Sequence, residues 1–92
     1  MILNIRHKGL RVFWEKGETR RLNQNWLDRI DRIMNALDQA QTPADMDLPG
    51  FRLHMLRGDY QGFYAADVSG NWRIVFRFEG NDTTDIDLTD YH

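Results

Sequence analysis

The sequence predicts an α+β fold in which two helices precede a mostly antiparallel sheet, in the order β-α-α-β-β-β-β. The first half of the chain carries apolar residues at helical spacing, whereas from Phe51 onward apolar and polar residues alternate with a period of two. Pro43 and Pro49 bracket the change of period. We expect both helices to pack on one face of the sheet and the other face to be polar.

The first half is predicted to contain a short strand and two helices. Residues 2–7 alternate loosely and include enough β-branched side chains for a strand. A short helix follows and is expected to end at Gly17; its apolar face consists of Leu10, Phe13 and Trp14. The second helix is expected to begin at an N-cap, Asn23 or Asn25, and to end near Ala40; its apolar stripe consists of Trp26, Ile30, Ile33 and Leu37.

The second half is predicted to form four strands, over residues 51–56, 62–68, 72–78 and 84–89, after a linker at residues 41–50. In the first strand, one face would carry Phe51, Leu53 and Met55. In the third, the helix-facing side would carry Trp72, Ile74, Phe76 and Phe78, and the opposite side Arg73, Val75 and Arg77. In the last, Thr84, Ile86 and Leu88 would alternate with Asp85, Asp87 and Thr89.

The composition is that of a small soluble protein. A chain of 92 residues, with 41% apolar residues and eleven aromatic ones, is expected to form a single domain over residues 1–92. The absence of cysteine excludes disulfides, cysteine-ligated zinc, iron–sulfur clusters and thiol catalysis. No apolar run reaches the roughly 20 residues of a membrane helix, and Arg6 comes too early for a signal peptide. A cytoplasmic location without membrane contact is therefore expected.

The net charge of −2 at first argues against a nucleic-acid partner, because phosphate binding depends on clustered Lys and Arg. The total hides a division along the chain. Residues 1–32 carry eight basic and four acidic side chains, a net of +4, whereas residues 33–92 carry four and ten, a net of −6. Ten of the twelve basic residues are arginine, which suits bidentate phosphate contacts. Two solvated faces of opposite charge would explain the same pattern.

Side chains that can move protons collect on the predicted polar face and its rim. His54 and Arg73 lie on this face and Arg57 ends the strand of His54, while the C-terminus supplies Asp90, Tyr91 and His92. With no evident Ser–His pair, the set does not suit acyl transfer. It suits phosphodiester cleavage, which needs a base for the attacking hydroxyl, a cation for the phosphorane and an acid for the leaving oxygen. Histidine can supply the acid or base near neutral pH, and arginine the clamp.

Structural roles for these residues stay open at this point. A histidine in a strand is often a hydrogen-bonded structural residue, and the aromatic residues of 72–78 are expected to be core rather than a base-stacking platform. Arg73 and Arg77 can pair with carboxylates of the last strand, Asp85 and Asp87. No metal or other cofactor is expected, since the three histidines lack ligand spacing: His7, His54 and His92.

Five motifs in order resemble HigB toxins of the RelE/ParE superfamily over nearly the whole chain. They are the opening strand with His7-Lys8-Gly9-Leu10, the stretch Leu53-His54-x-Leu56-basic-Gly58-Asp59, the pair Gly62-Phe63, the run Asn71-Trp72-Arg73-Ile74-Val75-Phe76, and the terminal Asp90-Tyr91-His92. The resemblance implies a bacterial type II toxin with the same sheet, which cleaves messenger RNA in the ribosomal A site. It also implies a helix-turn-helix antitoxin of HigA type as partner, and a toxin–antitoxin heterotetramer on operator DNA.

By the same resemblance, the cleavage residues are His54, Arg57, Arg73, Asp90, Tyr91 and His92. In such enzymes the 2′-hydroxyl attacks the adjacent phosphate and the 5′-oxygen leaves, without a metal ion. His54 or His92 would transfer protons, Asp90 would orient or accept one, Arg73 and Arg57 would clamp the phosphate, and Tyr91 would donate a hydrogen bond or stack on a base. Arg57 stands where the family more commonly has lysine, and arginine cannot readily act as a general acid.

The acidic total is unusual for a ribosome-binding toxin. The charge division therefore points to the helical half as the ribosome contact, in particular to Lys16, Arg20 and Arg21. Two other functions stay open. The chain can be a ParE-like inhibitor of DNA gyrase without nuclease activity, or an inactive family member that only binds the antitoxin.

Overall fold

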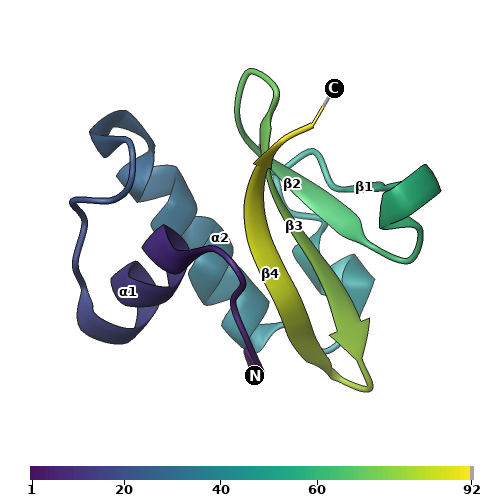
Figure 1. The fold of residues 1–92 in the computed structure, drawn as a ribbon. Coiled ribbons are helices and arrows are strands. Elements are labelled where there is room, and N and C mark those ends of the chain that lie inside the picture. Colours follow the sequence, from purple (N-terminus) through teal and green to yellow (C-terminus); the bar gives the residue numbers. More distant parts are fainter. Residues whose placement is uncertain (92) are drawn as a thin grey trace.

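The computed structural model describes residues 1–91, and within them two α-helices precede a four-stranded antiparallel sheet of order β1-β2-β3-β4 (Figure 1). The helices are α1 (Lys8–Lys16) and α2 (Leu27–Gln39), and the strands are β1 (His54–Met55), β2 (Tyr64–Ser69), β3 (Trp72–Glu79) and β4 (Asp82–Asp90). Three 3-10 helices connect them: η1 (Gln24–Trp26), η2 (Pro43–Met46) and η3 (Gly58–Tyr60). The predicted α+β fold is confirmed. No helix within residues 1–91 is long and apolar enough to cross a membrane.

The N-terminal segment lies along β4 but does not form the strand predicted over residues 2–7. Only two isolated parallel bridges form, between Ile2 and Thr83 and between Ile5 and Ile86. Between them, the side-chain oxygen of Asn4 accepts a hydrogen bond from the backbone N–H of Asp85 at 2.6 Å. Regular pairing stops here because β4 is irregular at Asp85, where φ is 54°.

The helix boundaries follow the predicted caps. Gly17 ends α1 in the left-handed conformation, with φ of 72°, and its N–H donates to the carbonyl of Phe13. The Asn23 side chain accepts from Asn25 N and starts η1, which leads directly into α2; Ala40 is the C-cap of α2. Both predicted helices are therefore confirmed. Asn23 caps η1, through which the chain enters α2, whereas the N-cap position of α2 itself is Trp26, which makes no side-chain cap hydrogen bond.

The motif at residues 7–10 has a structural role. The Nδ1 atom of His7 accepts a hydrogen bond from the backbone N–H of Leu10 and so caps α1. A Cβ atom added at Gly9 would lie 2.9 Å from the His7 ring and 3.1 Å from Leu22. Only glycine fits this approach between α1 and the loop that follows it.

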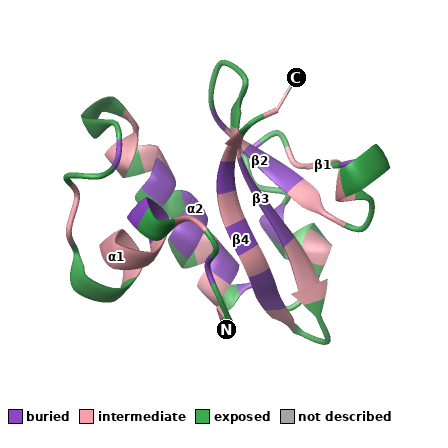
Figure 2. Cartoon of the chain, in the orientation of Figure 1, coloured by how far each residue is buried: buried purple, intermediate pink, exposed green. Residues whose placement is uncertain are grey.

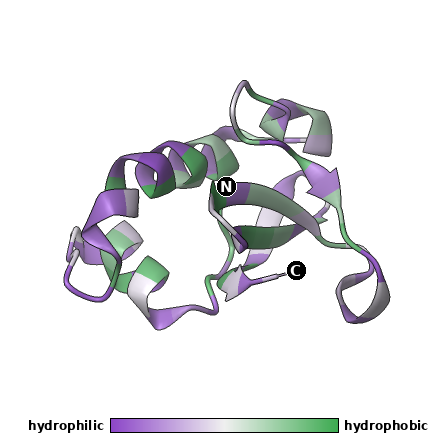
Figure 3. Cartoon of the chain, turned by 90° about the horizontal axis from the view of Figure 1, so that it is seen from above, coloured by the Kyte–Doolittle hydropathy of each residue, from purple (hydrophilic) through white to green (hydrophobic). Residues whose placement is uncertain are grey.

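The main core lies between the helices and one face of the sheet (Figure 2). Seen from above, apolar stretches of the sheet lie beside the helical layer (Figure 3). The buried residues of α2 are Ile30, Ile33, Met34 and Leu37, and the sheet contributes Ala66, Val68, Ile74, Phe76, Ile86 and Leu88. The predicted helix-facing side of β3 is thus confirmed. The predicted linker at residues 41–50 is more than a linker, since η2 buries Met46 completely in this core.

The strand predicted over residues 51–56 is reduced to His54–Met55, but its expected alternation of faces is confirmed. Phe51 and Leu53 pack in the helix-facing core, and Leu56 packs on the opposite face of the sheet. Met55 lies on the helix-facing side, opposite Tyr64, but it is 70% exposed because β1 is an edge strand. One extra residue interrupts the pairing before His54: β2 takes two steps from Asp67, which donates to the carbonyl of Phe51, to Ala65, which pairs with His54. The opposing segment takes three steps, and Arg52 adopts a φ of 53°.

A second extra residue shifts β4. The pairs Val75–Asp87 and Arg77–Thr84 leave two residues of β4 opposite one residue of β3. Thr83 therefore faces the helices, where its hydroxyl donates to the carbonyl of Leu37 at 3.1 Å, and Thr84 faces the other way. The predicted alternation holds from Ile86 onward and is wrong for Thr84.

The sheet face opposite the helices, which we call the open face, is not uniformly polar as predicted. A second apolar cluster covers its middle, formed by Leu56, Ala65 and Val75 with Tyr60, Phe63 and Tyr91 packed against them. Side chains that flank this cluster make up the candidate site.

Candidate functional site

The open face brings together three of the residues expected to act on RNA. His54 pairs with Ala65 and lies on this face, and Arg73 lies on it next to Val75. Tyr91 continues β4, with its N–H donating to the carbonyl of Asn71, and its ring contacts Tyr60 edge-on with centroids 5.8 Å apart. The end of the described chain is thereby fixed against the apolar cluster.

Arg73 is held by an aspartate that the sequence analysis did not identify. Its Nε lies 3.0 Å from the Asp67 carboxylate, and its Nη1 donates to the carbonyl of Gly70 at 2.7 Å. The side chains of Arg73 and Asp67 are only 17% and 20% exposed. The other oxygen of Asp67 lies 3.4 Å from the Nε of Arg52. We call Arg52, Asp67 and Arg73 the Asp67 triad. The predicted pairing of Arg73 with Asp85 or Asp87 is wrong, because Asp67 lies directly opposite on β2.

The half-buried His54 ring is oriented by the backbone. Its Nδ1 lies 2.7 Å from the carbonyl oxygen of Arg52. A carbonyl can only accept, so Nδ1 carries the proton that is donated, and the Nε2 of the neutral ring keeps its lone pair. Arg52 thus links the two residues: its carbonyl orients His54, and its guanidinium contacts the aspartate that holds Arg73.

Arg57 lies at the rim of the open face. It is exposed and lines a hollow of about 620 Å³ together with Met55, Leu56, Gln61 and Gly62. Its guanidinium makes no ion pair with any residue between 1 and 91. An exposed, unpaired arginine next to this hollow is available to an anionic ligand.

The remaining C-terminal residues are placed differently. Asp90 is exposed and pairs with Trp72, at a strand position that faces the helices rather than the open face. Trp72 itself packs against Trp26, with ring centroids 5.6 Å apart, in accord with its predicted place on the helix-facing side. His92 lies outside the described residues.

The expected ribosome contact lies in the other layer of the molecule. Lys16 ends α1, and Arg20 and Arg21 follow in the exposed loop between the helices. Arg20 donates from Nε to Glu18 at 3.1 Å, and this hydrogen bond, with the charge of Arg20, lowers the pKa of the Glu18 carboxyl. Part of the predicted positive charge of this layer is therefore paired locally.

A second arginine pair lies at the other end of the open face. The side chain of Asp85 is only 14% exposed and accepts a hydrogen bond from the Nε of Arg77, which is one of the predicted cross-strand pairs. The Asp85 carboxylate also lies 3.4 Å from the Nε of Arg6. We call these three residues the Asp85 triad. Partial burial raises the pKa of the Asp85 carboxyl, but the hydrogen bond from Arg77, both arginine charges and Asn4 outweigh it, so the pKa lies below its ordinary value.

This shift predicts a pH-dependent stability. Because the pKa of Asp85 is lower in the folded chain than in the unfolded chain, the ionised carboxylate stabilises the fold above about pH 3.9 and this contribution is lost as the pH falls further. Asp85→Asn is expected to reduce the free energy of unfolding at pH 7 by about 1.5 kcal/mol, the lower range for a charged hydrogen bond. Urea unfolding at neutral and acidic pH should show the difference from the native chain shrinking on acidification. Asp47→Asn, at an exposed carboxylate of the loop after η2, should show no such trend.

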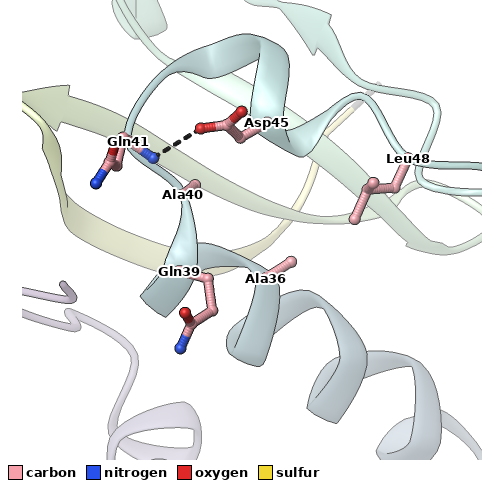
Figure 4. Close-up of a pocket in the computed structure, with 6 residues that line it drawn as sticks. All are labelled: Ala36, Gln39, Ala40, Gln41, Asp45 and Leu48. Atoms are coloured by element: carbon pink, nitrogen blue, oxygen red, sulfur yellow. Dashed lines mark hydrogen bonds between the residues drawn. The ribbon is translucent and has the colours of Figure 1, made fainter.

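Another cavity belongs to the helical layer (Figure 4). It has a volume of about 370 Å³ and is lined by Ala36, Gln39, Ala40, Gln41, Asp45 and Leu48. Its carboxylate already has a structural role, since Asp45 accepts from the backbone N–H groups of Gln41 and Thr42, and these hydrogen bonds lower its pKa. Within residues 1–91, no three His, Asp or Glu side chains lie close enough together to hold a metal ion.

The chain has two layers, with both helices on one face of an antiparallel sheet and with arginine, histidine and tyrosine side chains on the opposite face. These are the features expected of RelE-like toxins. A family model described as the RelE-like toxin of type II toxin-antitoxin system HigB matches residues 3–92. The chain is 36% identical over 92 residues to "Endoribonuclease HigB" of Proteus vulgaris, covering all of both chains. It is 29% identical over 80 residues to "Toxin HigB-1" of Vibrio cholerae serotype O1, covering 85% of this chain and 84% of the relative. The chain therefore belongs to the HigB-like toxin family of type II toxin–antitoxin systems.

Proposed function

We propose that this HigB-family toxin is an endoribonuclease that cuts messenger RNA in the A site of translating ribosomes. The observation that carries the proposal is the placement of His54, whose Nδ1 faces the Arg52 carbonyl, on the same face as the preorganised guanidinium of Arg73. The full-length similarity to a relative named Endoribonuclease HigB supports it.

In the proposed reaction, Nε2 of His54 takes the proton from a ribose 2′-hydroxyl, whose oxygen attacks the adjacent phosphate. Negative charge then builds on the phosphorane oxygens. There Arg73 supplies a donor that is fixed before the reaction begins, and the exposed Arg57 supplies a second cation. The bond to the 5′-oxygen breaks, and this oxygen takes a proton from Tyr91 or His92 at the end of the chain. Asp90, whose strand position faces the helices, takes no part in this step. The scheme needs no metal ion or cofactor.

A type II toxin is controlled by a cognate antitoxin protein. We propose that this antitoxin has a helix-turn-helix domain of HigA type and that the two proteins form a heterotetramer on operator DNA. Because the proposed substrate is mRNA on ribosomes, the toxin would act in the cytoplasm. The exposed Lys16, Arg20 and Arg21 are the proposed contacts to ribosomal RNA from the helical layer.

The test is to add purified toxin to ribosomes translating a defined mRNA, to the same mRNA without ribosomes, and to a DNA gyrase supercoiling reaction. We expect in-frame cuts at translated codons only with ribosomes, and unchanged supercoiling. Inhibition of gyrase without cleavage would show a ParE-like inhibitor instead. Antitoxin binding without either activity would show an inactive binding module, and both results would contradict the proposal.

A further inference from the structure

The Asp85 triad lies on the open face but apart from the residues of the proposed cleavage reaction. Arg6 and Arg77 share the carboxylate of Asp85, and the guanidinium of Arg6 lies over the ring of Phe63, 5.7 Å from its centroid. We propose that this triad binds a backbone phosphate of the same RNA strand, several nucleotides from the one that is cut. The inference rests on the proposed ribonuclease function and adds a second RNA subsite to it.

The triad has the charge and the free donors that a phosphate needs. Two guanidiniums against one carboxylate leave one unit of positive charge. Both arginines contact Asp85 through Nε, and within residues 1–91 no hydrogen bond occupies their terminal Nη groups. These planar N–H forks match phosphate oxygens in geometry. The side chains of Arg6 and Arg77 are 53% and 38% exposed, so a ligand can reach them.

The Asp85 triad repeats the construction of the Asp67 triad. In each, one aspartate lies between the Nε atoms of two arginines. Each contains one residue with positive φ where an extra residue interrupts strand pairing, Arg52 at 53° and Asp85 at 54°. Such irregularities redirect side chains and are common beside active sites. A polyanion with regularly spaced phosphates can contact two equivalent arginine pairs on one face at the same time.

The positions of the two triads define a path for a single strand. Arg73 and Arg77 lie four residues apart on the same face of β3, a separation of about 13 Å. A single strand that runs between the two arginines therefore brings two different phosphates to them, a few nucleotides apart. The aromatic rings of the apolar cluster lie on the same face: Tyr60, Phe63 and Tyr91. Base stacking on such rings favours RNA over an acidic peptide as the ligand.

The first experiment measures steady-state cleavage on programmed ribosomes by Arg6→Ala. This change keeps the hydrogen bond from Arg77 to Asp85, so the strand irregularity stays supported. Because the subsite binds a part of the RNA that does not react, we expect KM to rise roughly tenfold with kcat unchanged. Arg32→Ala is the matched control: it also removes an arginine that lies over a phenylalanine ring, Phe51 at 5.6 Å, but from α2 in the other layer.

The second experiment measures binding of a 2′-O-methyl RNA oligonucleotide, which cannot be cut, by fluorescence anisotropy over a range of salt concentrations. Loss of one phosphate contact is expected to lower the slope of log K against log salt by about 0.7 in Arg6→Ala. Arg32→Ala should keep the full slope, and Arg6→Lys, which retains the charge, should keep most of it.

The possible outcomes test the proposed RNA subsite and the proposed ribonuclease function separately. If Arg6→Ala matches Arg32→Ala in KM and in salt slope, the subsite is wrong while the ribonuclease function stands. If the native toxin cuts no mRNA on ribosomes, the proposed function fails, and the oligonucleotide still decides whether the triad binds RNA. Absence of oligonucleotide binding by the native toxin, or an effect of Arg6→Ala on antitoxin affinity alone, would also overturn the proposal.

Discussion

Replacing Arg73 by alanine is expected to lower the single-turnover rate of mRNA cleavage on ribosomes by about 10²–10³-fold, the loss typical for a preorganised donor to a transition-state oxyanion. The guanidinium is already fixed by Asp67 and by the carbonyl of Gly70 before any substrate binds. Its remaining Nη can donate to a phosphorane without reorganisation. The exposed Arg57 lacks such a support, so it cannot replace Arg73 at the same strength.

Two further variants separate the role of the charge from that of its support. Arg73→Lys keeps a cation but cannot contact Asp67 and the phosphate together, so only a small part of the rate should return. Asp67→Asn keeps the shape of the support and removes its charge, and a moderate decrease in rate is expected, with kcat affected more than KM. All variants should still bind the antitoxin, which controls for folding. A fully active, folded Arg73→Ala would remove Arg73 from the reaction.

The fold was accessible from the sequence because its strongest signals are local. The apolar stripe of α2, the caps at Asn23 and Gly17, and the alternation along β3 each depend on residues close in the chain, and all are confirmed. The sequence shows the motif at residues 7–10, but it does not show the structural role of these residues. His7 caps a helix and Gly9 allows a close contact with Leu22, which only the folded chain shows.

The parts that escaped prediction share one cause, an extra residue in a strand pair. Such an insertion leaves the period-two pattern almost unchanged in the sequence but reverses the faces beyond it. This explains why Thr84 faces opposite to expectation. It also explains why Arg52 was missed as the residue whose carbonyl orients His54. Asp67 was missed because its partner Arg73 is selected by strand register, which composition does not reveal.

The fold also changes the interpretation of the charge difference between residues 1–32 and residues 33–92. The −6 half of the chain is not an acidic surface throughout, since two of its aspartates each lie between two arginines on the open face. One of those arginines, Arg6, comes from the basic N-terminal segment, which lies along β4. Folding therefore gathers arginine side chains at two places on the open face, although the chain as a whole carries −2.

The second large effect is expected at His54, where Asn is the informative replacement. Its side-chain N–H₂ lies close to the place of Nδ1 and can still donate to the Arg52 carbonyl, so the local structure is kept. It has no group at the place of Nε2 that accepts a proton. We expect cleavage by His54→Asn to fall by about 10²–10⁴-fold, the usual contribution of a general base, with little change in the free energy of unfolding.

Chemical rescue decides whether the lost group was a base. The His54 ring is only half-buried, so its removal in His54→Ala leaves a space that a small molecule can reach from solvent. Added imidazole should therefore restore part of the cleavage rate of His54→Ala, in proportion to its concentration of neutral form, and should not affect Arg73→Ala. If His54→Asn cleaves at the native rate, the ring serves only to hold the Arg52 carbonyl. The proton would then have to leave the 2′-hydroxyl through the C-terminal residues instead.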